Sequence, residues 1–129
     1  MKTKAPWPID DCIETQKNVH RIECGLVIAS YLLGKPKELR KGDQSRIVDG
    51  LKTSHSLLGA ISSNVPEEMK TAVKKTRTAI ARALAVARNT PMPSNVNSRL
   101  KLTTAVSKAL DAKVAMETIA NGLCRKGRE

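Results

Sequence analysis

Apolar residues recur along this chain at intervals of three and four, the spacing that places side chains on one face of an α-helix. The first such stretch begins near Pro8, and Asp10 and Asp11 follow where carboxylates suit the positive end of a helix dipole. Gly34 and Pro36 end it. Its apolar positions are Ile9, Cys12, Ile13, Val19, Ile22, Leu26, Ala29 and Leu33.

Two further amphipathic stretches follow a basic connector at residues 35–41. The second helix is predicted to begin around Asp43, as its N-cap, and to end at the polar residues 62–64. The third helix has Pro66 in its first turn and a basic residue, Arg88, near its negative end. Both are long enough to contribute a full apolar side to a core.

A fourth helix is predicted from Ser98 to Gly122, after a proline-containing loop at residues 89–98. Residues 124–129 are predicted to form a flexible basic tail. The apolar positions of this helix are heptad-like, as in helices packed nearly parallel or antiparallel to their neighbours. They are Leu102, Ala105, Ala109, Ala112, Met116, Ile119 and Leu123.

These four segments predict an all-α protein, a single-domain up-and-down four-helix bundle spanning residues 1–129. Composition agrees, because the chain has no Phe, one Trp and one Tyr, so its core must be built from aliphatic side chains and alanine. Short connections after the first and second helices favour antiparallel neighbours. This topology would bring the first and third connectors to the same end of the bundle.

The chain is strongly basic, with 23 Lys and Arg against 12 Asp and Glu and a formal net charge of +11. The predicted topology gathers much of this charge at the end with the first and third connectors, which we call the basic pole. Its members are Lys35, Lys37, Arg40, Lys41, Arg46, Arg88, Arg99 and Lys101. A basic row on the third helix, Lys70, Lys74 and Arg77, continues it, and Lys75 and Arg82 form a second, smaller row.

Clustered Lys and Arg supply phosphate affinity without reading base sequence, and so few aromatic residues argue against stacking on unpaired bases. The first hypothesis is therefore a non-enzymatic accessory or regulatory protein that binds DNA or RNA through its backbone. The alternative is a protein-binding regulator, an inhibitor or adaptor that docks its basic surface on an acidic face of a larger partner. A third reading is a homo-oligomer formed through the alanine-rich seam of the fourth helix.

Candidate catalytic and metal-binding groups do not combine into a site. His20 and Cys24 lie four residues apart and could supply two metal ligands, but no further ligands are placed beside them, so we interpret them as a partly exposed histidine next to a small buried cysteine. His55 lies between two serines, but adjacent helical residues point apart. No glycine-rich phosphate loop occurs. The sequence predicts no enzyme, no metal and no cofactor.

The remaining expectations concern location and one aromatic residue. Three cysteines, Cys12, Cys24 and Cys124, are an odd number at wide spacing, which predicts no disulfide framework and a cytoplasmic location. The longest apolar run is too short to span a bilayer, so no membrane partner is expected. Trp7, between two prolines, is interpreted as a lid over the end of the bundle or as a partner anchor.

Overall fold

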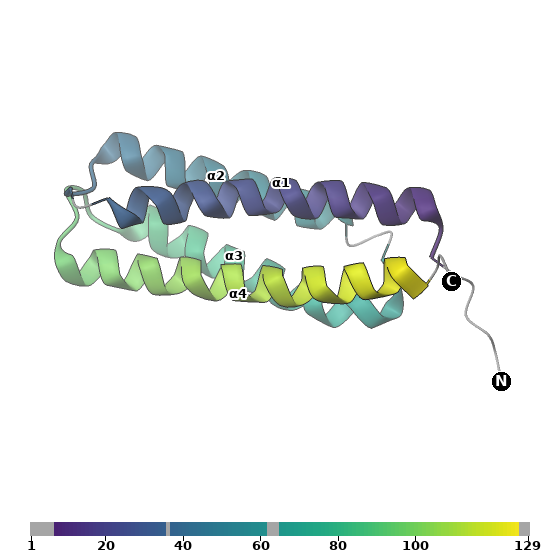
Figure 1. Ribbon diagram of the computed structural model, residues 1–129. Coiled ribbons are helices and arrows are strands. Elements are labelled where there is room, and N and C mark those ends of the chain that lie inside the picture. Colours follow the sequence, from purple (N-terminus) through teal and green to yellow (C-terminus); the bar gives the residue numbers. More distant parts are fainter. Residues whose placement is uncertain (1–6, 36, 62–64, 127–129) are drawn as a thin grey trace.

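A computed structural model describes residues 7–35, 37–61 and 65–126, and the described chain is helical with no strand. The helices are α1 (Ile9–Gly34), α2 (Lys41–Ile61), α3 (Glu67–Asn89) and α4 (Val96–Lys126). They lie alongside one another as an elongated bundle (Figure 1). The predicted all-α four-helix bundle is confirmed.

The helices alternate in direction, so each packs against its neighbours in sequence and α4 closes the bundle against α1. Among the described residues, no Cα atoms of either diagonal pair, α1 with α3 or α2 with α4, lie within 8 Å of each other. The first and third connectors meet at one end, where the backbone N–H of Ser94 donates to the carbonyl of Leu39 (3.2 Å). The start of α1 and the end of α4 lie together at the other end (Figure 1).

Two helices begin earlier than the sequence predicted. Helix α2 begins at Lys41, and Asp43 lies inside its first turn, where its carboxylate accepts a hydrogen bond from the backbone N–H of Arg40 (3.0 Å). Helix α4 begins at Val96, because the side chain of Asn95 accepts a hydrogen bond from the backbone N–H of Ser98 (2.8 Å). In both cases a polar side chain satisfies an N–H group that the helix itself leaves unpaired.

The end of α4 also differs from the prediction, since the helix continues to Lys126. The expected flexible tail at 124–129 is therefore wrong for residues 124–126, and residues 127–129 lie outside the described part. A disulfide joins Cys12 at the start of α1 to Cys124 in this last part of α4, and their Cα atoms are 5.9 Å apart. The expectation that the cysteines form no disulfide is likewise wrong, and the antiparallel arrangement of α1 and α4 explains why.

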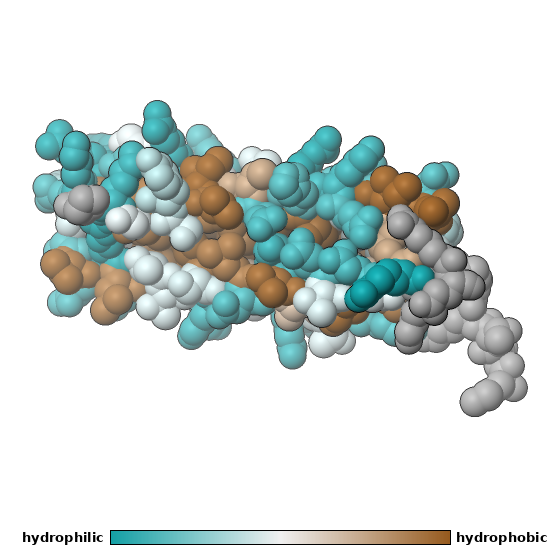
Figure 2. All heavy atoms as spheres, in the orientation of Figure 1, coloured by the Kyte–Doolittle hydropathy of each residue, from teal (hydrophilic) through white to brown (hydrophobic). Residues whose placement is uncertain are grey.

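The core is aliphatic, as the composition required. Its largest fully buried side chains come from all four helices and the first connector, and include Ile22, Leu39, Leu51, Ile80 and Leu102. The alanine-rich seam of α4 is used inside this core, so it does not form an exposed face, and the homo-oligomer stays a prediction. Figure 2 shows apolar side chains left on the surface over α1 and α4.

Helices α1 and α2 approach each other most closely at two glycines. A Cβ atom added at Gly25 would lie 2.5 Å from the carbonyl oxygen of Gly50 and 2.3 Å from Oγ of Ser54. A Cβ atom at Gly50 would lie 2.9 Å from the carbonyl oxygen of Gly25. The buried Ser54 hydroxyl donates to the carbonyl of Ile22 across the same contact (2.9 Å). Only glycine leaves room for the two backbones at this crossing.

The seam between α1 and α4 contains a buried lysine. The side chain of Lys113 is 3% exposed, and its Nζ lies 3.4 Å from Oε1 of Glu23 on α1 and 3.5 Å from Oε1 of Glu117 on α4. Both carboxylates are more than one third exposed. Two partners therefore compensate the burial of this ammonium group, as a buried charge requires.

No helix in the described ranges is long and apolar enough to cross a membrane.

Candidate functional site

The basic pole exists as one structural unit because the two connectors that carry it are held together. Besides the bond from Ser94 to Leu39, the side chain of Arg99 on α4 reaches across to the end of α1. Its Nε and Nη2 donate to the carbonyl of Leu33 (3.2 and 2.6 Å), and its guanidinium also donates to the carbonyls of Lys35 and Lys37. Arg99 thus binds one carbonyl group in the last turn of α1 and two carbonyl groups of the first connector.

Because the Arg99 guanidinium is bound to backbone carbonyls, Arg99 has a structural role within the basic pole. Helix α1 has no basic residue in its own last turn, so Arg99 supplies the positive charge that suits the negative end of the helix dipole. Its side chain is half-buried and its donors point to backbone oxygens. Of the predicted pole residues, Arg99 therefore organises the two connectors, and its neighbours present the exposed charge.

A second polar side chain fixes the same end of the bundle. Nε2 of Gln44 on α2 donates to the carbonyls of Ala87 and Thr90 at the end of α3 (2.8 and 3.0 Å). Thr90 also donates from Oγ1 to the carbonyl of Val86 (2.6 Å). The C-termini of both α1 and α3 are satisfied by side chains from neighbouring helices, so the pole rests on a rigid support.

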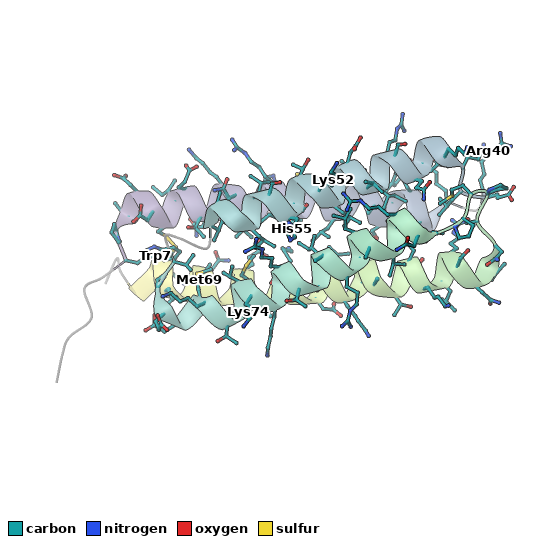
Figure 3. The ribbon with its side chains drawn as sticks, turned by 180° about the vertical axis from the view of Figure 1, so that it is seen from behind. Trp7, Arg40, Lys52, His55, Met69 and Lys74 are labelled. Atoms are coloured by element: carbon teal, nitrogen blue, oxygen red, sulfur yellow. A yellow bond between two sulfur atoms is a disulfide. The ribbon has the colours of Figure 1, made fainter. Side chains whose placement is uncertain are left out.

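The other pole residues point their charge outward. One of them, Lys35, is half-buried, and its Nζ lies 5.1 Å from the centre of the exposed Tyr31 ring, a cation–π contact. Arg40 lies at the extreme end of the bundle (Figure 3). The exposed members are Lys37, Arg40, Lys41, Arg46, Arg88 and Lys101. The structure thus brings together the residues that the sequence predicted for the basic pole.

A hollow of about 520 Å³ lies within the pole, along the first connector. Two acidic residues, Glu38 and Asp43, line it together with cations and the buried Leu39. Because carboxylates and cations are mixed there, the hollow does not suit one anion, and the outer cations are the part of the pole that faces a large polyanion.

The basic row on α3 is less uniform than the sequence predicted. Nζ of Lys70 pairs with Oε2 of Glu67 one turn earlier (2.8 Å), which partly neutralises this end of the row. Lys74 and Arg77 are exposed, and Figure 3 shows Lys74 pointing away from α2. Lys74 therefore belongs to a different surface, the one between α3 and α4.

That surface is a groove of about 400 Å³ between α3 and α4. Its lining is mostly apolar, formed by alanines, threonines and the aliphatic parts of long side chains, with four cations and no acidic residue. We call it the α3–α4 groove, and its lining residues are Thr71, Lys74, Lys75, Thr78, Ala79, Arg82, Ala105 and Lys108.

Sequence reasoning only partly found this groove. Lys75 and Arg82 were recognised as a second row seven residues apart, but were not assigned to a site. Lys108 on α4 carries no signal of its own, since a single lysine on an exposed helical face is ordinary. Only the antiparallel packing of α3 against α4 brings Lys108 beside the groove cations of α3, Lys74, Lys75 and Arg82.

The remaining candidates lie elsewhere. Trp7 is half-buried against the core at the end opposite Arg40, near Met69, which agrees with a lid, and its role as a partner anchor stays a prediction (Figure 3). His20 is exposed with Nδ1 3.8 Å from Oε2 of Glu23, and Cys24 is exposed, so its interpretation as a buried cysteine is wrong.

His55 also has no catalytic arrangement around it. The neighbouring Ser54 is buried and its hydroxyl donates to a backbone carbonyl of α1. In the described part of the chain, no three His, Cys, Asp or Glu side chains come together as a group that could hold a metal ion.

Comparison of the chain with family models, with curated proteins and with solved structures finds no match, so the residues themselves carry the functional argument.

Proposed function

We propose that this protein is a non-enzymatic accessory protein that binds nucleic acid by contacting the phosphate backbone with its basic pole. The observation that carries the proposal is the joining of the first connector, which is basic, to the third connector, which basic residues of α3 and α4 flank, by the Ser94–Leu39 and Arg99 hydrogen bonds. This arrangement presents several exposed Lys and Arg side chains from different helices on one rigid end. Such a surface matches the regular negative charge of a duplex.

Backbone contact is favoured over base readout by what the pole lacks. Tyr31 is the aromatic residue at this end, and its ring already faces Lys35. Asp43 and Asn95 each bind one N–H group at the starts of α2 and α4, so cationic side chains would supply the phosphate contacts. Affinity would then come from exposed cations, without sequence specificity. The half of the basic row that is not paired, Arg77 with Lys74, would extend the contact along α3.

Fluorescence anisotropy with labelled duplex DNA and duplex RNA tests the proposal. For five phosphate contacts, a slope of about −0.9 per contact predicts an affinity about 500-fold lower at 200 mM salt than at 50 mM. The triple variant Lys37→Glu, Arg40→Glu and Lys41→Glu should abolish binding at 200 mM salt. All three side chains are exposed, and none makes a hydrogen bond with the described residues.

A matched control separates the pole from bulk charge. Lys17→Glu, Arg21→Glu and Lys52→Glu change the net charge by the same amount on exposed positions of α1 and α2 outside the pole. This control should keep most of the affinity. Equal loss in both triple variants, or no binding of either duplex by the wild-type protein at 50 mM salt, would refute the proposal.

The cytoplasmic location expected from the sequence needs a separate test. Disulfides persist in oxidising compartments and are rare in the cytosol, so the Cys12–Cys124 disulfide weighs against that expectation. Thiol alkylation of the protein in its native cells, followed by mass spectrometry, distinguishes an oxidising compartment from a reducing one. One alkylated cysteine indicates an oxidising compartment, and three indicate a reducing one.

A further inference from the structure

We infer that the α3–α4 groove is a docking site for an acidic amphipathic helix of a protein partner. The inference goes beyond the proposed nucleic-acid binding and does not depend on it, because the groove shares no residue with the basic pole and only Lys74 with the extension of that contact along α3. It rests on three features of the groove: its cations make no ion pair within the described part of the chain, their positions follow helical spacing, and its floor is aliphatic.

The four cations of the groove are available for a ligand. Lys74, Lys75 and Arg82 from α3 and Lys108 from α4 make no ion pair with the described residues. No carboxylate lines the groove. Four like charges that converge on one hollow repel each other, so an anionic partner would relieve an unfavourable interaction as well as form new ones.

The cations are spaced so that a partner α-helix lying along the groove could reach them with side chains on one of its faces. Lys75 and Arg82 are seven residues apart, which is about 10.5 Å along the axis at ~1.5 Å per residue. The hydrogen bond from Oγ1 of Thr76 to the carbonyl of Ala112 (3.1 Å) sets the antiparallel register of α3 and α4. One helical turn further along, Lys108 then lies opposite the segment between Lys75 and Arg82.

The floor of the groove suits aliphatic side chains. Ala79 and Ala105, with Thr71 and Thr78, are small, so they leave room for larger side chains of a partner between the two helices. A helix that places Leu or Ile on the floor and Asp or Glu at positions seven apart along the edge would contact both the apolar floor and the cations of the groove. Grooves of this kind bind amphipathic helices in other proteins.

Nucleic acid fits the groove less well. Phosphodiester chains gain little from an aliphatic floor, and no aromatic residue lines the groove to stack on a base. The apolar floor therefore favours a peptide over a nucleic acid in the groove. The exposed pole has charge but no apolar floor, so it favours a nucleic acid over a peptide.

Phage display of random 16-residue peptides on the immobilised wild-type protein tests this inference. Selected peptides should combine Leu, Ile or Met with Asp or Glu at helical spacing. Replacement of the acidic residues of one selected peptide by their amides should lower its affinity at least tenfold by fluorescence anisotropy. The protein variant Lys75→Glu with Lys108→Glu should lower the affinity for the original peptide by a similar factor.

The matched protein control is Lys17→Glu with Lys52→Glu, two exposed positions on α1 and α2, and it should change the affinity less than twofold. Circular dichroism checks that each variant is folded, and Lys75→Gln with Lys108→Gln replaces the reversed pair if it is not. The inference is overturned if selection yields no binding peptide, if the selected peptides lack acidic residues, or if the groove variant binds them as tightly as wild type. It is also overturned if the groove variant loses duplex DNA binding and leaves peptide binding unchanged.

Discussion

The two hairpins of the bundle, α1–α2 and α3–α4, both use small residues where their helices meet, but with opposite results. At Gly25 and Gly50 the backbones of α1 and α2 touch, and Ser54 bonds across the contact. Between α3 and α4, alanines and threonines line an open groove, and long cations stand at its edges.

The difference shows that small residues do not have a fixed structural meaning. Glycine removes the Cβ atom and lets two helices close on each other, so nothing enters between them. Alanine and threonine keep a Cβ atom, and the lysines and arginine beside them repel each other and stay in solvent. The first hairpin therefore closes at its helix crossing, whereas the second leaves an open groove lined by cations.

The largest expected effect comes from separating the two hairpins at the disulfide. Cys12 and Cys124 enclose most of the chain, with a sequence separation of 112, so the disulfide lowers the entropy of the unfolded chain by closing a long loop. We expect Cys12→Ser with Cys124→Ser to lower the free energy of unfolding by about 4 kcal/mol in urea titrations. Cys24→Ser is the control and should leave stability unchanged, since Cys24 is exposed and unpaired. Equal stability of all three proteins would contradict this account.

The next effect concerns the ionic contact that joins the hairpins. Glu23→Gln with Glu117→Gln leaves the buried Lys113 ammonium without an anionic partner, and we expect a cost of about 3 kcal/mol. Lys113→Met should cost about 1 kcal/mol, because the partly exposed carboxylates it leaves behind can be hydrated. Adding Lys113→Met to the double variant should recover stability. Additive costs in this cycle would show that the three charges do not interact.

A smaller effect tests the close packing of the first hairpin directly. Gly25→Ala places a methyl group 2.3 Å from Ser54 Oγ and 2.5 Å from the Gly50 carbonyl oxygen, so the helices must move apart. We expect a loss of about 2 kcal/mol in thermal or urea unfolding. Gly122→Ala, where nothing lies within 4 Å of the added Cβ, should instead stabilise the protein by about 0.5 kcal/mol through helix propensity. Similar changes at both glycines would disprove the special role of the crossing.

The smallest effect is expected in the second hairpin. Lys75→Glu and Lys108→Glu alter the edges of the groove without touching the core, so each should change the free energy of unfolding by less than about 0.5 kcal/mol. The same calorimetric or urea measurements used for Gly25→Ala check this. A loss as large as that at Gly25 would mean that the groove cations support the fold.

Local patterning along the chain was enough to predict the helices and their order. The apolar period of three and four, prolines in first turns and short connections predicted four antiparallel helices, and the structure confirms them. The boundaries shifted by a few residues wherever a polar side chain bonds a helix end, as Asp43 and Asn95 do. The cations of the pole were predicted together because topology alone brings their connectors to one end.

What the pattern could not predict depends on contacts between distant residues. By sequence, Arg99 resembles any other exposed cation. In the structure, its guanidinium donates to the carbonyl of Leu33 at the end of α1, 66 positions earlier in the chain. By helix propensity alone, Gly25 and Gly50 would only destabilise their two helices. In the structure, they allow the two backbones to cross closely. No local signal distinguishes these residues from others of their type.

The sequence by itself determined the helices, their antiparallel order and the location of most positive charge, because periodicity and short connections act locally. Only the tertiary structure decided that Cys12 meets Cys124, that Lys113 is buried between two carboxylates, and that Lys108 joins the cations of α3. These pairings depend on the rotation and register of whole helices against each other, which side-chain packing over the entire core fixes.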